Sequence, residues 1–272
     1  MTRAAEAFKA GRFAPTPSGP LHMGSLVTAL ASYCQARSQQ ASWLLRIEDV
    51  DTPRVITGSA DDILYTLEAF GFEWDGEVLY QSTRFSDYEA VIQQLQQQGL
   101  VNPCECSRKS LLAQDLRTGP LGMIYPGHCR HKKLQRHDYS LRLNVQQAGE
   151  IGFDDLHYAP YKLDVSRDVG DVVLKRVDGI YAYHLAVVVD DAWQRIDHIV
   201  RGADLLEVTS LHLYLYRLLE LQPPRYLHIP LMKNAEGKKL SKQTGAEGLD
   251  IQRSSELLLE ALGFLGQKVD SG

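Results

Sequence analysis

The first hundred residues alternate between short apolar runs and apolar positions at helical spacing. A short strand is predicted to end at Phe13, and helically spaced positions after the following loop predict a helix that begins near Gly24 or Ser25. Within this helix we expect Cys34 to be a small buried side chain. The apolar run 43–47 predicts a buried strand that ends in an acidic cluster.

Two further helices are predicted before residue 100. The first begins at Ser59, and the second is marked by Ser86 and Glu89, which have the S-x-x-E spacing of a capping box, with Gly99 as its stop signal. Strand, helix, strand and helix in this order indicate an α/β fold with a Rossmann-like, doubly wound parallel sheet.

The regular pattern breaks in the middle of the chain and then resumes. We therefore expect one half of a nucleotide-binding core at 1–102, an insertion with its own organisation at 103–163, and the second half of the core at 164–272. In the last part, apolar runs predict strands at 171–177, 183–189, 196–200 and 226–230, and helical spacing predicts helices at 211–221 and 254–264.

Composition and charge narrow the class of protein. The chain is 44% hydrophobic and 23% charged, as is ordinary for a soluble globular protein, and its net charge of −5 argues against a nonspecific polycation for nucleic acid. No apolar run approaches the ~20 residues of a membrane span, and the N-terminus lacks the apolar stretch of a secretion signal. We expect a cytoplasmic monomer with no DNA and no membrane partner.

Three of the four cysteines lie close together in the predicted insertion. Cys104 and Cys106 are too near each other to form a comfortable disulfide, and Cys129 follows after a short stretch. Without a secretion signal, metal binding is the better interpretation of the trio. Next to Cys129, the basic cluster 130–137 predicts either a local basic face or a solvated loop.

The loop after the first strand and the helix that follows it have the features of a phosphate site. The carboxyl edge of a parallel sheet is where α/β folds bind ligands, and a helix that begins near Gly24 would direct free N–H groups toward that edge. His22 could hydrogen-bond a phosphate there, although a lone histidine at a helix start is more often a capping residue.

A second candidate phosphate site lies near the end of the chain. Lys239 and Lys242 are separated by two residues on a glycine-flanked loop and could clamp a polyphosphate. In isolation, such a segment is more often a solvated basic loop.

Taken together, four segments resemble the class I glutamyl- and glutaminyl-tRNA synthetases. Residues 22–25 (HMGS) and 239–243 (KLSKQ) resemble the HIGH and KMSKS signatures, with Ser25 and Gln243 as departures. Residues 12–22 (RFAPTPSGPLH) and 45–51 (LRIEDVD) resemble two runs typical of the same branch. The resemblance implies a class I synthetase catalytic core that forms glutamyl-adenylate from L-glutamate and ATP with Mg²⁺.

The resemblance also implies roles for individual residues. Arg12 and Arg201 would bind the carboxylates of glutamate, Glu48 its ammonium group, and Tyr183 would line the pocket. Other implied glutamate-binding residues are Phe13, Ala14, Pro15 and Thr16. The implied ATP-binding residues are His22, Gly24, Ser25, Lys239 and Lys242, of which His22 and Lys242 are the expected catalytic groups.

The distance from the second signature to the end of the sequence suggests a particular group within this family. Residues 244–272 are too few for an anticodon-binding domain. In this respect the chain resembles the glutamyl-Q tRNA(Asp) synthetases, which are stand-alone relatives of the catalytic half. That group carries a C-x-C … Y-x-x-x-C zinc pattern, matched by Cys104, Cys106, Tyr125 and Cys129. On ligand chemistry alone His128 would be a better fourth ligand than Tyr125. The resemblance therefore implies an inserted subdomain with structural Zn²⁺.

The function implied is transfer of activated glutamate to the queuosine base in the anticodon loop of tRNA(Asp). One alternative is a truncated glutamyl-tRNA synthetase that charges a tRNA 3′ end. Another is a noncatalytic zinc-bearing module that binds tRNA. An ordinary nucleotidyltransferase would share the His-x-Gly pattern but would not explain residues 12–22 and 45–51.

Overall fold

The computed structural model describes residues 9–132, 134, 138–233 and 247–268, and it divides the chain into two compact units. Unit 1 comprises residues 1–80, 195–204 and 224–272, and unit 2 comprises 81–194 and 205–223. The domain boundaries expected from the sequence, after residues 102 and 163, fall inside strands β4 (Val101–Cys104) and β9 (Tyr161–Asp164). That three-part division stays a prediction.

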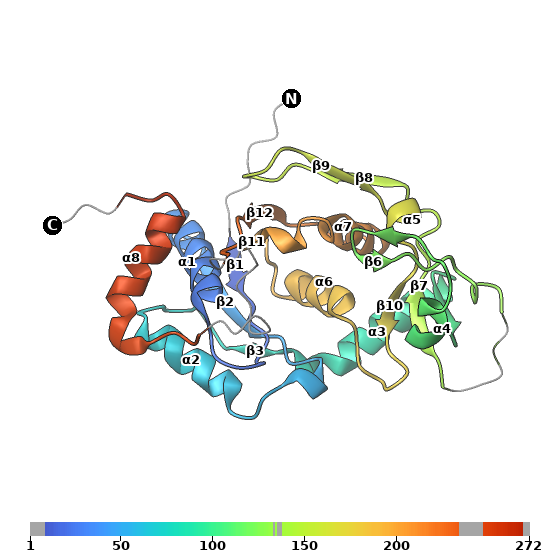
Figure 1. Ribbon diagram of the computed structural model, residues 1–272, viewed down its shortest axis with the longest axis horizontal. Helices are drawn as coiled ribbons and strands as arrows, with labels where there is room; N and C mark the ends of the chain where they lie inside the picture. The colour runs from blue at the N-terminus through green and yellow to red at the C-terminus, as the bar shows by residue number, and fades with distance from the viewer. Residues whose placement is uncertain (1–8, 133, 135–137, 234–246, 269–272) are drawn as a thin grey trace. The chain divides into compact units, whose positions relative to one another are not determined.

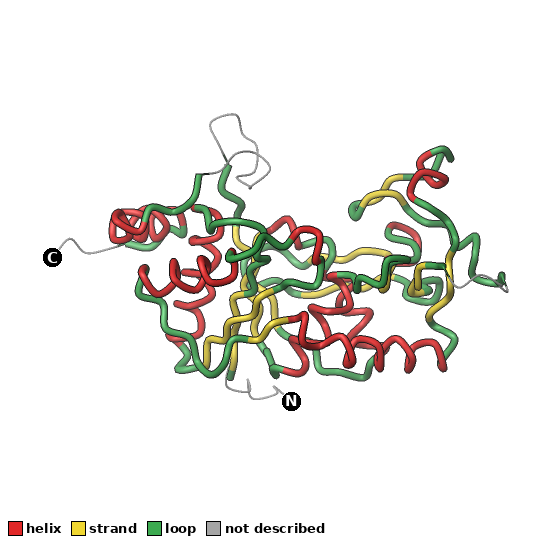
Figure 2. The backbone as a smooth tube through the Cα atoms, turned by 90° about the horizontal axis from the view of Figure 1, so that it is seen from below, coloured by secondary structure: helices red, strands yellow, loops and turns green. Residues whose placement is uncertain are grey.

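Unit 1 is built on parallel strands (Figures 1 and 2). β1 (Ala10–Phe13), β2 (Ser42–Ile47) and β3 (Leu79–Tyr80) form one parallel ladder, and β11 (His198–Gly202) and β12 (Arg225–Ile229) form another. β11 lies beside β1, and Asp197 N donates a hydrogen bond to Ala10 O at 3.1 Å. The parallel α/β core expected from the sequence is therefore present in this unit.

Helices cover the parallel strands of unit 1. α1 (Met23–Ser38) packs against β1, β2 and β11, and α8 (Ser254–Phe264) packs against α1. α2 (Ser59–Ala69) begins at the predicted residue and contributes Ile63 and Leu67 to the same core. α8 has the predicted bounds, because its apolar spacing runs without interruption between polar ends.

Trp43 is the centre of the unit 1 core. It is fully buried on β2, its ring stacks near Phe72, Tyr33 meets it edge-on, and its Nε1 donates to Ser32 Oγ at 3.0 Å. The apolar part of this indole is therefore packed against other rings, and its polar N–H has a hydrogen-bond acceptor. Cys34, one residue beyond Tyr33 on α1, is exposed, so the prediction that it is buried is wrong.

Unit 2 has antiparallel sheets, which the sequence pattern did not indicate. Its main sheet has the order β10-β7-β4, and two hairpin-like pairs, β5-β6 and β8-β9, accompany it. The bounds not yet given are α3 (Phe85–Gln97), α4 (Arg108–Leu112), β5 (Thr118–Gly119), β6 (Gly122–Met123), β7 (Ser140–Leu143), β8 (Glu150–Phe153), α5 (Val165–Asp168), β10 (Val172–Lys175), α6 (Tyr183–Trp193) and α7 (Thr209–Leu218).

The predicted strand at 183–189 is wrong, because these residues form the first part of helix α6. A short, continuous apolar run does not distinguish a buried strand from a helix that is buried on most sides. Residues 185–191 are all buried, including Asp190 and Asp191. Helical periodicity is invisible in a segment that has almost no exposed face.

The predicted capping box of α3 is also wrong. A 3-10 turn at Gln81–Arg84 leads directly into α3, so Ser86 is the second residue of the helix and makes no side-chain cap. Glu89 accepts hydrogen bonds from Lys175 Nζ at 2.6 Å and Tyr181 Oη at 2.8 Å instead. The hydrogen bond from Lys175 holds the pKa of Glu89 below its usual value despite partial burial. Gly99 follows the end of α3 with a φ of 72°, as expected for a helix stop.

Candidate functional site

The loop between β1 and α1 forms one wall of a cavity of about 450 Å³ in unit 1. The other wall comes from the segments after β11 and β12, which end at the same carboxyl edge of the parallel strands. The cavity is lined by Phe13, Pro15, Thr16, Ser18, Leu21, His22, Gly24, Ser25, Val27, Thr28, Arg54, Gly202, Asp204, Pro230, Leu231 and Met232. Six of these belong to the expected glutamate and ATP residues.

His22 is the N-cap of α1. Its Nδ1 accepts a hydrogen bond from Ser25 N at 3.3 Å, and its backbone is extended, with φ −123° and ψ 172°. The capping interpretation of this histidine is therefore correct. Because one ring nitrogen caps the helix, the ring is held at the cavity wall next to Gly24 and Ser25, where helix N–H groups favour an anion.

The cavity wall has little free space at Gly202. A Cβ added there would lie 2.6 Å from Asp204 Oδ1 and 2.9 Å from Leu231 Cδ2. Glycine lets the end of β11 approach the neighbouring segments closely. Asp204 and Arg54 also line this cavity, and sequence reasoning did not single out either residue. Their closeness to His22 depends on the return of distant segments to one sheet edge.

Arg12 and Arg201 lie on β1 and β11, two strands that are next to each other, and each is at most 5% exposed. The Nε of Arg201 donates to His228 Nε2 at 3.1 Å, and its guanidinium lies 4.9 Å from the ring centroid of Tyr226. The plane of the Arg201 guanidinium is thus fixed by two side chains of β12. Two buried guanidinium groups on adjacent strands are chemically suited to a dicarboxylate.

Glu48 follows β2, and its backbone N donates to Pro15 O at 3.0 Å, which ties it to the cavity-lining loop. One oxygen of Glu48 lies 3.2 Å from the Nη2 of Arg46, which is fully buried. Glu48 is therefore part of an internal ion pair, as well as the residue expected to receive an ammonium group. Sequence reasoning did not single out Arg46, although its position within an apolar strand was a visible signal.

The remaining expected residues lie elsewhere or outside the described part of the chain. Arg12, Ala14, Glu48 and Arg201 are all absent from the cavity lining given above, and Ala14 is half-buried on the loop after β1. Tyr183 is the first residue of α6 in unit 2, with its ring centroid 5.6 Å from that of His212. Lys239 and Lys242 lie outside the described residues, so the second half of the expected ATP site has no structural description.

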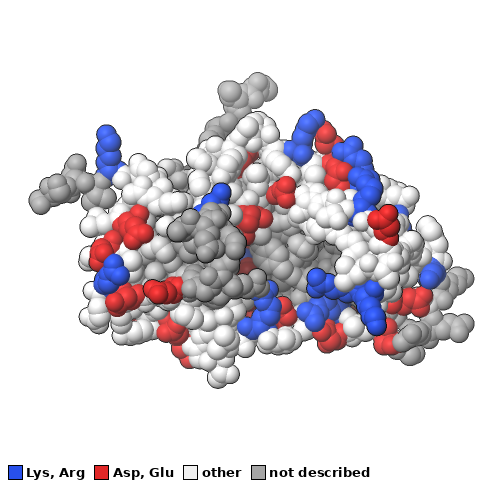
Figure 3. All heavy atoms as spheres, in the orientation of Figure 1, with Lys and Arg blue, Asp and Glu red and all other residues white. Residues whose placement is uncertain are grey.

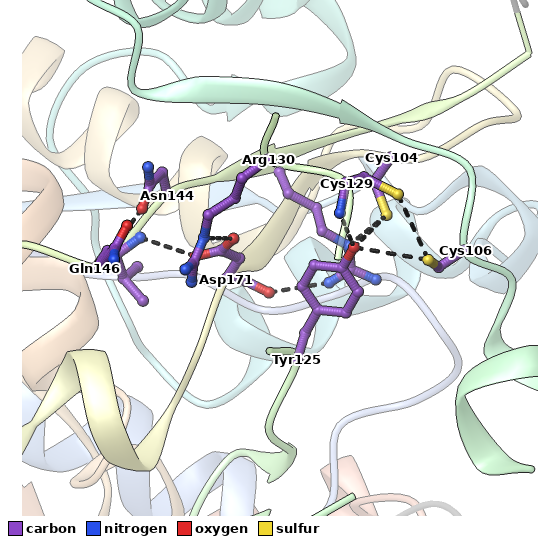
Figure 4. A network of polar contacts seen from close by, with 10 residues as sticks. Cys104, Cys106, Tyr125, Cys129, Arg130, Asn144, Gln146 and Asp171 are labelled. Atoms are coloured by element: carbon purple, nitrogen blue, oxygen red, sulfur yellow. Dashed lines mark hydrogen bonds and ion pairs between the residues drawn. The ribbon is translucent and has the colours of Figure 1, made fainter. Parts of the chain in front are cut away.

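The cysteine trio converges in unit 2. Among the described residues, Cys104, Cys106 and Cys129 form a group that could hold a metal ion, with sulfur atoms within 4.8 Å of one another. The hydroxyl oxygen of Tyr125 lies 3.3 Å from Cys104 Sγ and 3.6 Å from Cys106 Sγ (Figure 4). His128 is exposed and its Nε2 contacts Gln114 Oε1 at 3.0 Å. The geometry therefore favours Tyr125 over His128 as the fourth ligand.

The spacing of these atoms fits zinc. Tetrahedral geometry with Zn–S near 2.3 Å places sulfurs about 3.8 Å apart, and an oxygen ligand about 3.6 Å from each sulfur. The Cys106 and Cys129 sulfurs are 3.6 Å apart. Burial and the Cys129 contact raise the pKa of Cys106 to about 11. Burial also acts to raise the pKa of Cys104, but hydrogen bonds from Tyr125 and the Cys106 amide, with the charge of Arg142, lower it overall.

The basic cluster that follows Cys129 is not simply a solvated loop. Arg130 forms an ion pair with the buried Asp171 at 2.7 Å, whereas the half-exposed Lys132 pairs with Glu105 at 3.0 Å. Lys133, Arg136 and His137 lie outside the described residues. On the face drawn in Figure 3, basic side chains lie among acidic ones, and that face is not uniformly positive.

Comparison with known proteins places the chain in a family. Residues 10–257 match the model for tRNA synthetases class I (E and Q), catalytic domain. The glutamyl-Q tRNA(Asp) synthetase of Dechloromonas aromatica (strain RCB) is 51% identical over 95% of this chain and 86% of its own length. The chain belongs to the glutamyl-Q tRNA(Asp) synthetase family. The family member from Neisseria gonorrhoeae (strain ATCC 700825 / FA 1090) is 50% identical over 94% of this chain and 87% of its own.

The class I catalytic fold is supported by a solved structure as well. The glutamate-tRNA synthetase of Elizabethkingia anophelis is 27% identical, with a TM-score of 0.74 over 88% of this chain. The chain matches only 53% of the length of that synthetase. The described helices include none that is both long enough and apolar enough to cross a bilayer.

Proposed function

We propose that this chain activates L-glutamate with ATP to glutamyl-adenylate and transfers glutamate to the queuosine base in the anticodon loop of tRNA(Asp). The observation that supports this most is the cavity in unit 1, where residues 13, 15 and 16 and the start of α1 line one wall. Phe13, Pro15 and Thr16, expected for glutamate, and His22, Gly24 and Ser25, expected for ATP, line it at the edge where α/β folds bind nucleotides. Membership of the glutamyl-Q tRNA(Asp) synthetase family supports the choice of acceptor.

In the proposed first step, a glutamate α-carboxylate oxygen attacks the α-phosphorus of ATP and forms a new P–O bond. The bond to the β-phosphate oxygen breaks, and pyrophosphate leaves. His22 and the N-terminus of α1 would stabilise charge on the crowded α-phosphate, with Lys242 acting from the segment outside the described residues. Mg²⁺ bound with ATP would neutralise phosphate charge.

Arg12 and Arg201 would hold the two carboxylates of glutamate, with Glu48 opposite its ammonium group and Tyr183 lining the pocket. Ala14 would contribute through the backbone of the loop. In the second step, a hydroxyl of the cyclopentene ring of queuosine attacks the activated carbonyl, AMP leaves with the bonding electrons, and the hydroxyl proton passes to the departing phosphate or to water. Positioning and charge stabilisation account for both steps, and no side-chain nucleophile is required.

We further propose that Cys104, Cys106, Tyr125 and Cys129 hold a structural Zn²⁺, which would cross-link β4 to the segment 125–129. A cytoplasmic monomer is proposed as the working state. The three-part division at residues 102 and 163 is proposed for the family core, with the zinc ligands in the middle part.

Glutamate-dependent pyrophosphate exchange into ATP tests the activation step directly. Exchange that requires glutamate is expected. Its absence from folded protein with intact His22, Arg201 and Lys242 would refute the proposal and favour a noncatalytic tRNA-binding module.

Arg54 gives a prediction that does not depend on the family motifs discussed above. Its side chain lines the same cavity as His22, so an ATP phosphate there would interact with its charge. Replacing Arg54 by Met should raise the KM for ATP in pyrophosphate exchange about tenfold, near the low end for a lost charged hydrogen bond. Arg37→Met is the control, because Arg37 pairs with Asp75 at 2.7 Å and is absent from the cavity lining. Equal KM values in both variants would exclude this role.

A further inference from the structure

Asp171 is the centre of a polar network beside the cysteine cluster (Figure 4). The residue is 3% exposed and lies immediately before β10. Its Oδ2 accepts from Arg130 Nε at 2.7 Å, while its Oδ1 accepts from Arg130 Nη2 at 2.9 Å and Val145 N at 3.0 Å. The carboxylate is therefore fully engaged by a bidentate guanidinium and a backbone amide.

One branch of the network reaches Cys129 and Tyr125 through the backbone. Arg130 is the residue after Cys129, and Tyr125 forms a parallel β-bridge with Gly170, the residue before Asp171. A Cβ at Gly127 would overlap the Arg130 guanidinium, and one at Gly170 would lie 2.6 Å from Tyr125 O. Both glycines have positive φ. The segments 125–130 and 170–171 are thus closely packed, and the ion pair fixes one against the other.

The second branch reaches Cys104 and Tyr125 through a side chain. Arg142 Nη1 donates to the backbone oxygen of Asp171 at 2.9 Å, and its Nε donates to Cys104 Sγ at 3.3 Å. Its guanidinium lies 4.2 Å from the centroid of the Tyr125 ring. A cation in this place orients two of the four expected ligands and offsets the negative charge of deprotonated sulfur.

From these contacts we propose that Asp171 is a positioning residue for the metal site: its carboxylate holds Arg130 beside Cys129, and its backbone oxygen holds Arg142 against Tyr125 and Cys104. The inference rests on the proposal that this cluster holds Zn²⁺. Metal ligands generally need hydrogen-bonded partners that fix their orientation, and loss of such a partner costs about 10- to 100-fold in metal affinity. Asp171 supplies this support from a segment that contributes no ligand itself.

A second buried ion pair in unit 2 provides a matched control. Asp190 is fully buried and accepts from Arg84 Nε at 2.9 Å, Gln81 Nε2 at 2.8 Å and Tyr88 Oη at 2.6 Å. It resembles Asp171 in burial and in its arginine partner, but the described contacts of Asp190 include none of the cysteines. Asp190→Asn should therefore weaken the fold of the same unit without a specific effect on the metal site.

The test compares Asp171→Asn, Arg142→Gln and Asp190→Asn with the unchanged full-length chain. Zinc affinity is measured by competition with a chromophoric chelator, and Co²⁺ is substituted to record its d–d and sulfur-to-cobalt absorption bands. We expect Asp171→Asn to bind zinc at least about tenfold more weakly, with altered Co²⁺ bands. Arg142→Gln should change in the same direction, and Asp190→Asn should stay within about threefold of the unchanged chain.

Three results would overturn the inference. Folded Asp171→Asn could keep its zinc affinity within about threefold and its Co²⁺ bands unchanged, or Asp190→Asn could lose as much affinity as Asp171→Asn. If Asp171→Asn does not fold, Arg130→Gln breaks the same ion pair from its other side, and unchanged affinity and bands in that variant have the same meaning. Failure of the unchanged chain to bind zinc would refute the zinc proposal itself. Tight binding by that chain with no effect of the variants would refute only the role of Asp171.

Discussion

Replacing His22 by Asn should reduce glutamate-dependent pyrophosphate exchange about 10²- to 10³-fold while leaving helix α1 intact. The imidazole lies at the cavity wall, where charge would develop on the α-phosphate during adenylate formation. Removal of one preorganised donor to developing charge has an effect of about this size in other enzymes. The reduction should appear mainly in kcat, because the interaction strengthens as the phosphate becomes crowded.

Two variants at this position separate the chemical role from the structural one. His22 caps α1 through Nδ1, and Asn is a favourable N-cap residue whereas Ala is not. His22→Ala should therefore lose about 1 kcal/mol in the free energy of unfolding, measured by urea denaturation, and His22→Asn only a fraction of that. If exchange falls in His22→Ala but persists in His22→Asn, the histidine is only a cap and the proposed catalytic role is wrong.

The second large effect is expected at the metal site, where Cys129→Ser should bind zinc close to a hundredfold more weakly. Structural zinc sites contribute about 10 kcal/mol or more in apparent binding free energy, and an even share among four ligands is about 2.5 kcal/mol for each. The Cys129 sulfur lies 3.6 Å from that of Cys106, and Cys129 N donates to Tyr125 Oη at 3.0 Å. The thermal midpoint of the zinc-loaded protein should fall as well, and a strong chelator should lower it in the unchanged chain.

Cys34→Ser is the matched control for this prediction. Cys34 lies on α1 in unit 1 and is exposed, and it is not among the clustered cysteines. The zinc content and zinc affinity of the Cys34→Ser variant, measured by metal analysis and chelator competition, should equal those of the unchanged chain. Equal zinc affinity in Cys129→Ser and Cys34→Ser would show that the trio does not bind the metal.

The sequence predicted those parts of the fold whose signals are local. The helix at 254–264 and the strand at 43–47 have clear apolar spacing and polar ends, and the structure has both. Helix α6 was missed because burial on most sides removes the polar face that reveals helical period. The start of α3 was misplaced because a 3-10 turn precedes it and Glu89 is engaged by β10 and Tyr181, which lie far away in the sequence.

Part of the candidate site could also be recognised in the sequence, because its motifs are continuous. Residues 13, 15 and 16 and the start of α1 do line one cavity, and the three cysteines do converge with Tyr125. Arg54 and Asp204 were not found, because only folding brings them to the cavity wall. Likewise, Arg130 was taken as part of a basic cluster, since its partner Asp171 lies 41 residues away.

Mapping the glutamylated nucleotide tests the central claim most directly. The chain is incubated with labelled glutamate, ATP and total tRNA, and the labelled tRNA is digested to nucleosides and identified by mass spectrometry. We predict that the label is attached to queuosine from the anticodon loop of tRNA(Asp). Label on the 3′-terminal adenosine of a tRNA would contradict this claim and show that the chain is a synthetase that charges tRNA ends.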